Sequence, residues 1–85
     1  MPVQTAVVGS AAGLHARPAA LIAEKAEELG VEVYLALPGD EPVDADSALM
    51  IMTLGAAKGD TVEVSGDDAA AVATIAALVE QDLDA

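Results

Sequence analysis

The chain has 85 residues and no cysteine, and its fifteen acidic residues outnumber three basic ones to give a formal net charge of −12. Without cysteine it has neither disulfides nor a thiolate metal site, and the negative charge argues against nucleic acids and anionic membranes as partners. We expect one domain over residues 1–85 in the cytoplasm, because the N-terminus lacks the basic region of a signal peptide and no apolar run reaches the ~20 residues that span a bilayer.

The first predicted elements are a strand and a helix. Side chains of residues 3–8 alternate with a period of two, which predicts a strand, and the glycine-rich segment 9–13 then predicts a loop. A helix is predicted over Ala16–Leu29, because Pro18 lies in its first turn, Gly30 follows its last turn and apolar residues recur at helical spacing. The residues of that apolar face are Ala19, Ile22, Ala26 and Leu29.

The middle of the chain shows the clearest alternation. Residues 31–37 predict a second strand. Residues 42–45 predict at most a short strand, which contains a proline and therefore belongs at or near a sheet edge. A short helix is predicted over residues 48–54, because Ser47 can cap it and Gly55 can end it.

The last two predicted elements are a strand over residues 61–64 and an alanine-rich helix opened by Asp67 and Asp68. The buried face of this helix is marked by Val72, Ile75 and Val79. The element order is therefore β, α, β, β, α, β, α. This order is typical of an α+β domain with helices on one face of a largely antiparallel sheet, and it leaves the order of the strands open.

His15 is the only histidine, and it lies immediately before the first predicted helix. The amides of Ala16 and Arg17 lack partners within such a helix, and the positive end of the helix dipole favours an anion at the same place. Arg17 adds a planar, permanently charged guanidinium that suits phosphate oxygens. No carboxylate precedes Glu24, so this part of the chain is predicted to be receptive to anions.

The imidazole of His15 is a candidate nucleophile, because histidine can form covalent intermediates and phosphoryl transfer depends mainly on positioning and charge stabilisation. A nitrogen–phosphorus bond is labile, which suits a transient carrier. The residues alone leave a second interpretation open, in which His15 is a surface or capping residue. A metal site is disfavoured, since no second histidine, cysteine or nearby carboxylate completes a ligand set.

Two segments carry a resemblance to a known family. Residues 13–18 read Gly-Leu-His-Ala-Arg-Pro, and residues 47–55 read Ser-Ala-Leu-Met-Ile-Met-Thr-Leu-Gly, followed by Lys58 and Gly59. The first segment matches without departure the phosphorylation-site signature of HPr, the histidine-containing phosphocarrier family of the bacterial sugar phosphotransferase system. The second segment is similar to the family's second signature at the expected distance, so the resemblance covers nearly the whole chain.

The resemblance implies a carrier rather than an enzyme, with no cofactor and no metal. His15 would accept a phosphoryl group from the phosphoenolpyruvate-dependent enzyme I, on the ring nitrogen nearer the backbone, and pass it to the A components of sugar permeases. Arg17 would steady that group. The implied fold is an open-faced β-sandwich with a four-stranded antiparallel sheet and three helices on one face, and a carrier shared between partners is expected to be a monomer.

Ser47 matches a regulatory serine that a dedicated kinase phosphorylates in some members of the family. There the added charge weakens phosphoryl acceptance at the histidine and recruits regulatory proteins. In this chain Asp44 and Asp46 would repel an added phosphate, and a helix cap already explains the serine. We therefore favour the capping role.

Two helices bear on partner docking. This chain has Ala48 where the family usually has a larger apolar residue, which leaves Leu49 and Met52 as the expected exposed contacts. The alternative is that both belong to the core. Where many relatives have neutral or basic residues, the first helix carries Glu24, Glu27 and Glu28. Such a run most often forms a solvated face, and a partner that docks on it should be less acidic.

Two other functions fit parts of the sequence. An acyl carrier protein is small and acidic, and Asp46-Ser47 resembles its phosphopantetheine site, but such carriers are helical bundles and this chain contains predicted strands. A regulatory or nitrogen-related HPr paralogue would share both the fold and the histidine motif. The presence of His15 argues only against family members that have lost the histidine.

Overall fold

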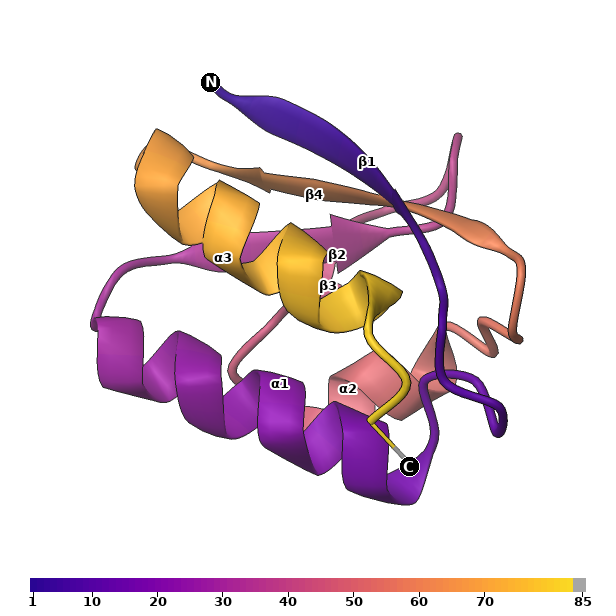
Figure 1. Ribbon diagram of the computed structural model, residues 1–85. Helices are drawn as coiled ribbons and strands as arrows, with labels where there is room; N and C mark the ends of the chain where they lie inside the picture. Colours follow the sequence, from indigo (N-terminus) through magenta and orange to yellow (C-terminus); the bar gives the residue numbers. More distant parts are fainter. Residues whose placement is uncertain (84–85) are drawn as a thin grey trace.

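The computed structural model describes residues 1–83, and its helices and strands follow the predicted order (Figure 1). In chain order they are β1 (Val3–Val7), α1 (Ala16–Leu29), β2 (Val33–Ala36), β3 (Val43–Asp44), α2 (Ala48–Thr53), β4 (Thr61–Gly66) and α3 (Ala69–Glu80). The second strand is shorter than predicted. The chain turns at Gly30, which has a left-handed φ of 72°, and Val31 stays outside the sheet with 40% of its surface exposed.

The sheet has the strand order β1-β4-β2-β3, which the sequence pattern did not provide. Every pairing is antiparallel: Val3 lies opposite Ser65, Leu35 lies opposite Val64, and on its other side Leu35 lies opposite Val43. The first strand therefore pairs with the last one. The two-residue strand β3 forms an edge of the sheet, which confirms the expectation for that segment.

The three helices lie on one face of the sheet and leave the other face open (Figure 1). Side chains alternate accordingly: Leu35 and Val64 are a buried pair beneath the helices, whereas Tyr34 and Ser65 face the open side. Burial of apolar surface on one face holds the two layers together. The described chain is an open-faced β-sandwich of the α+β class, and its sheet excludes the helical bundle of an acyl carrier protein.

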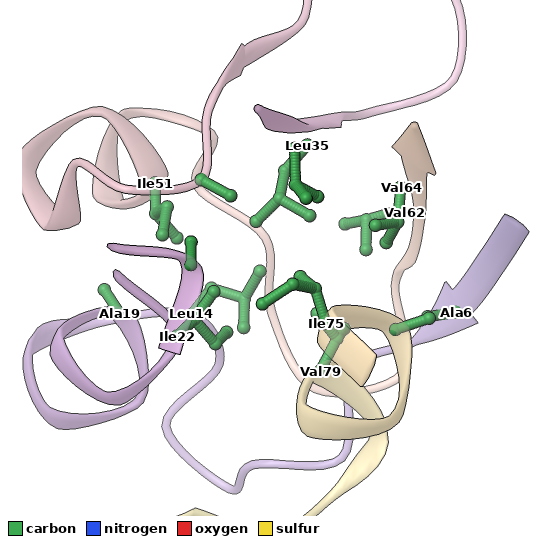
Figure 2. Packing of buried hydrophobic residues seen from close by; sticks show 14 of the residues in the cluster. Ala6, Leu14, Ala19, Ile22, Leu35, Ile51, Val62, Val64, Ile75 and Val79 are labelled. Carbon is green, nitrogen blue, oxygen red and sulfur yellow. The ribbon is translucent and has the colours of Figure 1, made fainter. Parts of the chain in front are cut away.

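Aliphatic side chains fill the space between the sheet and the helices. Figure 2 shows side chains from the helices and from the sheet directed into this shared interior. The largest fully buried ones are Ile22 of α1, Ile51 of α2, Ile75 of α3 and Leu35 of β2. The core contains no aromatic ring, because the chain's single aromatic residue, Tyr34, lies on the open face.

Local signals set the helix ends. Asp68 caps α3, since its Oδ1 accepts hydrogen bonds from the amides of Ala70 and Ala71 at 3.0 and 3.1 Å. Gly30 ends α1 in the left-handed conformation, and its amide donates to the Glu27 carbonyl at 3.1 Å. Within residues 1–83, none of the helices combines the length and the apolar character that crossing a membrane requires.

Candidate functional site

His15 is the N-cap residue of α1 and has an extended backbone, with φ −105° and ψ −164°. Its carbonyl accepts the first hydrogen bond of the helix from the Ala19 amide at 2.8 Å. Its side chain makes no capping hydrogen bond, and the residue is exposed. The structure thus excludes the interpretation in which the imidazole serves as a helix cap, and the ring is available to a partner.

The residues that follow His15 favour an anion beside the ring. Ala16 and Arg17 begin α1, so their amides have no acceptor within the helix, and the helix dipole adds partial positive charge. Pro18, the third residue, has no amide hydrogen, and its ring is buried. Arg17 is exposed and makes no ion pair within residues 1–83. A tetrahedral oxyanion here would meet both backbone amides and a guanidinium.

The loop before His15 is fixed by backbone contacts with the segment after α2. The Leu14 amide donates to the Ala56 carbonyl at 2.9 Å, and the Leu14 side chain is buried in the core (Figure 2). Gly13 has φ 74°, and a Cβ atom there would lie 2.4 Å from the Ala56 carbonyl oxygen. Only glycine fits at position 13. Leu14 therefore anchors the chain directly beside His15, while the imidazole remains outside.

A second support for the loop comes from the end of α3. The hydroxyl of buried Ser10 donates to the Gln81 carbonyl at 3.1 Å and accepts from the Leu83 amide at 3.0 Å. A Cβ atom on Gly9 would lie 2.0 Å from the Glu80 carbonyl oxygen, so glycine is also required there. Gly9 and Ser10 were not among the functional residues predicted from the sequence. The Gly9-Ser10 pair signals a turn, but the partner of Ser10 lies 71 residues away.

In the fold, carboxylates lie next to part of the acid-free segment that precedes Glu24. No carboxylate precedes Glu24 in the sequence, but the end of α3 brings Glu80 and Asp82 next to the loop. The Glu80 carboxylate accepts a hydrogen bond from the Val7 amide at 3.2 Å. Among residues 1–83, no group of three or more histidine, cysteine, aspartate or glutamate side chains is placed to hold a metal ion.

Ser47 is the N-cap residue of α2, as predicted. Its Oγ accepts a hydrogen bond from the Met50 amide at 3.3 Å. Ser47 is half-buried, while Asp44 and Asp46 are both exposed nearby in the chain. The hydroxyl therefore has a structural role that requires no modification.

Helix α2 exposes a different methionine from the one expected. Leu49 is 69% exposed, which agrees with the prediction, but the second exposed apolar side chain is Met50 at 42%. Met52 is half-buried and packs against the core next to fully buried Ile51. In a helix of six residues, packing against α1 selects the buried face, and no periodicity in the sequence reveals it. Leu49 and Met50 are therefore the large apolar side chains that α2 exposes.

The solvent face of α1 is acidic. Glu24, Glu27 and Glu28 are all exposed. Lys25 Nζ lies 3.2 Å from Glu28 Oε1, an exposed pair of small energetic value, whereas Glu24 and Glu27 make no ion pair within residues 1–83. Glu24 and Glu28 follow Arg17 by seven and eleven residues, so all three lie on one side of the helix. A partner that docks over His15 and α1 therefore meets the cation Arg17 next to His15 and the carboxylates farther along the helix.

The sequence and the fold are similar to those of known phosphocarriers. Residues 3–81 match the PTS-HPr family model, described as the PTS HPr component phosphorylation site. Phosphocarrier protein HPr of Streptomyces coelicolor is 39% identical over 73 residues, which cover 86% of this chain and 78% of that protein. Phosphocarrier protein NPr of Klebsiella oxytoca is 29% identical over 76 residues, 89% of this chain and 84% of that protein. The crystal structure of HPr-C-His from Thermoanaerobacter tengcongensis superimposes with a TM-score of 0.86 and 30% identity, covering 100% of this chain and 98% of that one.

Proposed function

The chain belongs to the PTS HPr family of phosphocarriers, and on this premise we propose that His15 carries a phosphoryl group between proteins of a phosphotransferase system. One observation carries the assignment to this residue. The exposed imidazole stands at the N-terminus of α1 without a capping hydrogen bond, next to the amides of Ala16 and Arg17. An anion held there is stabilised before and after transfer.

In the accepting step, the ring nitrogen nearer the backbone, Nδ1, attacks the phosphorus atom of the donor. The nitrogen–phosphorus bond forms as the bond between phosphorus and the donor atom breaks, and the leaving electron pair stays with the donor. His15 attacks as a neutral imidazole that keeps its proton on Nε2. The onward step reverses these events: the acceptor's nucleophile attacks phosphorus, and Nδ1 departs with the bonding pair.

The neighbours of His15 stabilise charge during both steps. The guanidinium of Arg17 can donate two parallel hydrogen bonds to phosphoryl oxygens, and the amides of Ala16 and Arg17 add donors whose direction the helix fixes. Phosphoryl transfer needs positioned positive charge more than covalent participation by other side chains. This requirement explains how a site with one nucleophile and one cation suffices.

The donor we propose is the phosphoenolpyruvate-dependent enzyme I, and the acceptors are the A components of sugar permeases, all in the cytoplasm. The similarity to HPr of Streptomyces coelicolor supports the sugar-uptake branch. The similarity to NPr of Klebsiella oxytoca favours, as a second candidate, a paralogue whose phosphorylation state regulates other proteins. The chemistry at His15 is the same in both cases, so the acceptors distinguish them.

Phosphorylation of the purified chain by enzyme I and phosphoenolpyruvate tests the proposal directly. Intact mass spectrometry should show one added phosphoryl group, which is lost in acid and survives mild base, unlike a serine ester. His15→Ala should fold normally and remain unmodified, because the residue is exposed and only the nucleophile is removed. Acid-labile modification of His15→Ala would refute the site. Onward transfer to a sugar-permease A component, compared with transfer to a regulatory acceptor, then identifies the branch.

A further inference from the structure

Strand β1 forms an open edge of the sheet, and part of its backbone faces solvent. Two hydrogen bonds bracket the β1–β4 pairing: the Gly66 amide donates to the Pro2 carbonyl at 3.2 Å, and the Val8 amide donates to the Asp60 carbonyl at 2.9 Å. In an antiparallel pair, alternate residues direct their amide and carbonyl toward the partner strand. The even-numbered residues of β1 therefore face β4, and the odd-numbered residues face outward.

One end of this outer edge is already occupied. The outward amide of Val7 donates to the Glu80 carboxylate at 3.2 Å, and the next turn of chain is tied to α3 by the Gly9 amide, which donates to the Val79 carbonyl at 3.1 Å. Within residues 1–83, the outward amides and carbonyls of Val3 and Thr5 have no such partner. The free edge is therefore the segment Val3–Thr5, and its side chains are exposed.

Charge also distinguishes this edge from the other one. Residues 2–14 contain no charged side chain, in a protein whose net charge is −12, although Glu80 brings a carboxylate to the Val7 end of the edge. The opposite edge, β3, has only two residues, includes Asp44 and is flanked by Glu41 and Asp46. Like charges placed opposite each other across strands are destabilising. A second molecule of the same net charge can therefore approach β1 more favourably than it can approach β3.

We propose that β1 pairs edge to edge, antiparallel, with β1 of a second copy, in a register centred on Gln4. This register sets Val3 opposite Thr5 of the second copy and, by symmetry, Thr5 opposite Val3, so the free groups form four backbone hydrogen bonds. The two Gln4 carboxamides meet at the twofold axis, where each supplies a donor and an acceptor. A register centred on Thr5 would require the Val7 amide, which Glu80 already binds.

The paired state leaves the phosphoryl site accessible. Figure 1 shows the N-terminal end of β1 and the start of α1 at opposite sides of the molecule. The contact involves three residues per chain, far less than the surface that a stable dimer buries. The association is therefore weak and concentration-dependent, and salt strengthens it by screening the repulsion between two acidic molecules.

Cysteine trapping tests the register, because the chain contains no cysteine of its own. At the axis, Gln4→Cys places the two Cβ atoms about 4.5–5.5 Å apart, close to the separation that a disulfide spans. The matched control is Thr61→Cys, which is also exposed but lies on β4, inside the sheet. Under mild oxidation at equal protein concentration, we expect Gln4→Cys to form the disulfide dimer several times faster than Thr61→Cys, and faster still at higher salt.

A second change isolates the backbone contribution. Adding Thr5→Pro to Gln4→Cys removes an outward amide without breaking the β1–β4 pairing, and it should slow trapping to the rate of Thr61→Cys, while Thr5→Ala should leave the rate high. Circular dichroism checks that each variant folds. Equal trapping rates for Gln4→Cys and Thr61→Cys would overturn the proposal. So would an unchanged rate in a folded Thr5→Pro variant.

Discussion

At the scale of single residues, substitutions of Arg17 separate the effects of charge and geometry beside the proposed nucleophile, His15. We expect Arg17→Lys to retain part of the phosphoryl-transfer rate, since it keeps the charge but loses the planar pair of donors. Arg17→Ala loses a charge-assisted contact worth on the order of 1.5–3 kcal/mol, which corresponds to a drop of roughly tenfold to a hundredfold. Stopped-flow or quench measurements with enzyme I and with a permease A component provide both rates.

The stability of these variants provides the control, because Arg17 makes no ion pair within residues 1–83 and is exposed. Their thermal unfolding should stay close to that of the wild type. Arg17→Glu should be slower than Arg17→Ala, since its carboxylate repels the phosphoryl group. A wild-type transfer rate in Arg17→Ala with both partners would remove Arg17 from the mechanism.

Tyr34 provides an electrostatic probe on the open face of the sheet. Its hydroxyl donates to the Glu32 carboxylate at 2.7 Å, and this hydrogen bond, with burial and the nearby charges of Glu32, Asp44 and Asp67, raises the pKa of Tyr34 from 10.0 to about 12. Because the chain has no other aromatic residue, ultraviolet titration of the phenolate reports this group alone. Glu32→Ala should move the midpoint back toward 10.

The sign of the linked effect on stability follows from that shift. The pKa of Tyr34 is higher in the folded than in the unfolded chain, so the stabilisation is fully present below pH 10 and is lost as the pH rises from 10 to about 12. Alkaline unfolding should therefore lose part of its pH dependence in Tyr34→Phe. A wild-type phenolate midpoint at 10 would contradict the hydrogen bond to Glu32.

At the scale of elements, the cap of α2 is the contact most easily tested. Ser47→Ala removes the acceptor for the Met50 amide and should lower the free energy of unfolding by about 0.5–2 kcal/mol, measured by denaturant titration. Ser47→Asn restores a capping oxygen without charge and should recover most of that loss. Phosphoryl acceptance at His15 should stay nearly unchanged in both. Unaltered stability in Ser47→Ala would mean that the cap contributes nothing.

Ser47→Asp distinguishes the cap from a regulatory role. Aspartate is a good N-cap residue, so the variant should be about as stable as the wild type. If added negative charge at this position regulates the site, phosphoryl acceptance by His15 should fall in Ser47→Asp but not in Ser47→Asn. Equal acceptance rates in the two variants would favour a purely structural serine.

The elements that the sequence predicted are those with local signals. Ser47 and Asp68 cap helices two or three residues away, and Gly30 ends α1 within its own turn. The geometry around His15 was predictable for the same reason, since the amides that favour an anion directly follow this residue in the sequence. Local chemistry therefore predicted the helices, whereas the proposed role of His15 also needed the resemblance of residues 13–18 to the HPr signature.

The features that the sequence did not predict depend on distant partners. The pairing of β1 with β4 and the contact between Ser10 and Gln81 join opposite ends of the chain. Met50 is exposed in place of Met52 because α1 covers one side of a helix too short to show a periodic pattern. The approach of Glu80 to the loop has the same origin, and it places negative charge where the sequence suggested none.

At the scale of the whole molecule, the net charge of −12 opposes the folded state through repulsion among the carboxylates. The chain carries fifteen acidic and three basic side chains, and within residues 1–83 the ion pair formed is Lys25–Glu28. Repulsion of this kind opposes the compact state and weakens when salt screens it. Salt also weakens the attraction between Lys25 and Glu28, but this loss is small because the ion pair is exposed.

The protein should therefore become more stable as the salt concentration rises from about 10 mM to about 0.15 M, a range over which the Debye length shrinks from roughly 30 to 8 Å. A gain of about 1 kcal/mol would raise the Tm by roughly 4–8 °C for a domain of this size, which calorimetry resolves easily. The matched control is Glu24→Gln combined with Glu27→Gln, which removes two exposed carboxylates that lack ion pairs within residues 1–83 and should reduce the dependence on salt. Sodium chloride is the appropriate salt, because sulfate stabilises most proteins through exclusion from their surfaces. A Tm that stayed constant or fell with sodium chloride would show that the repulsion among the carboxylates is equally present in the unfolded chain.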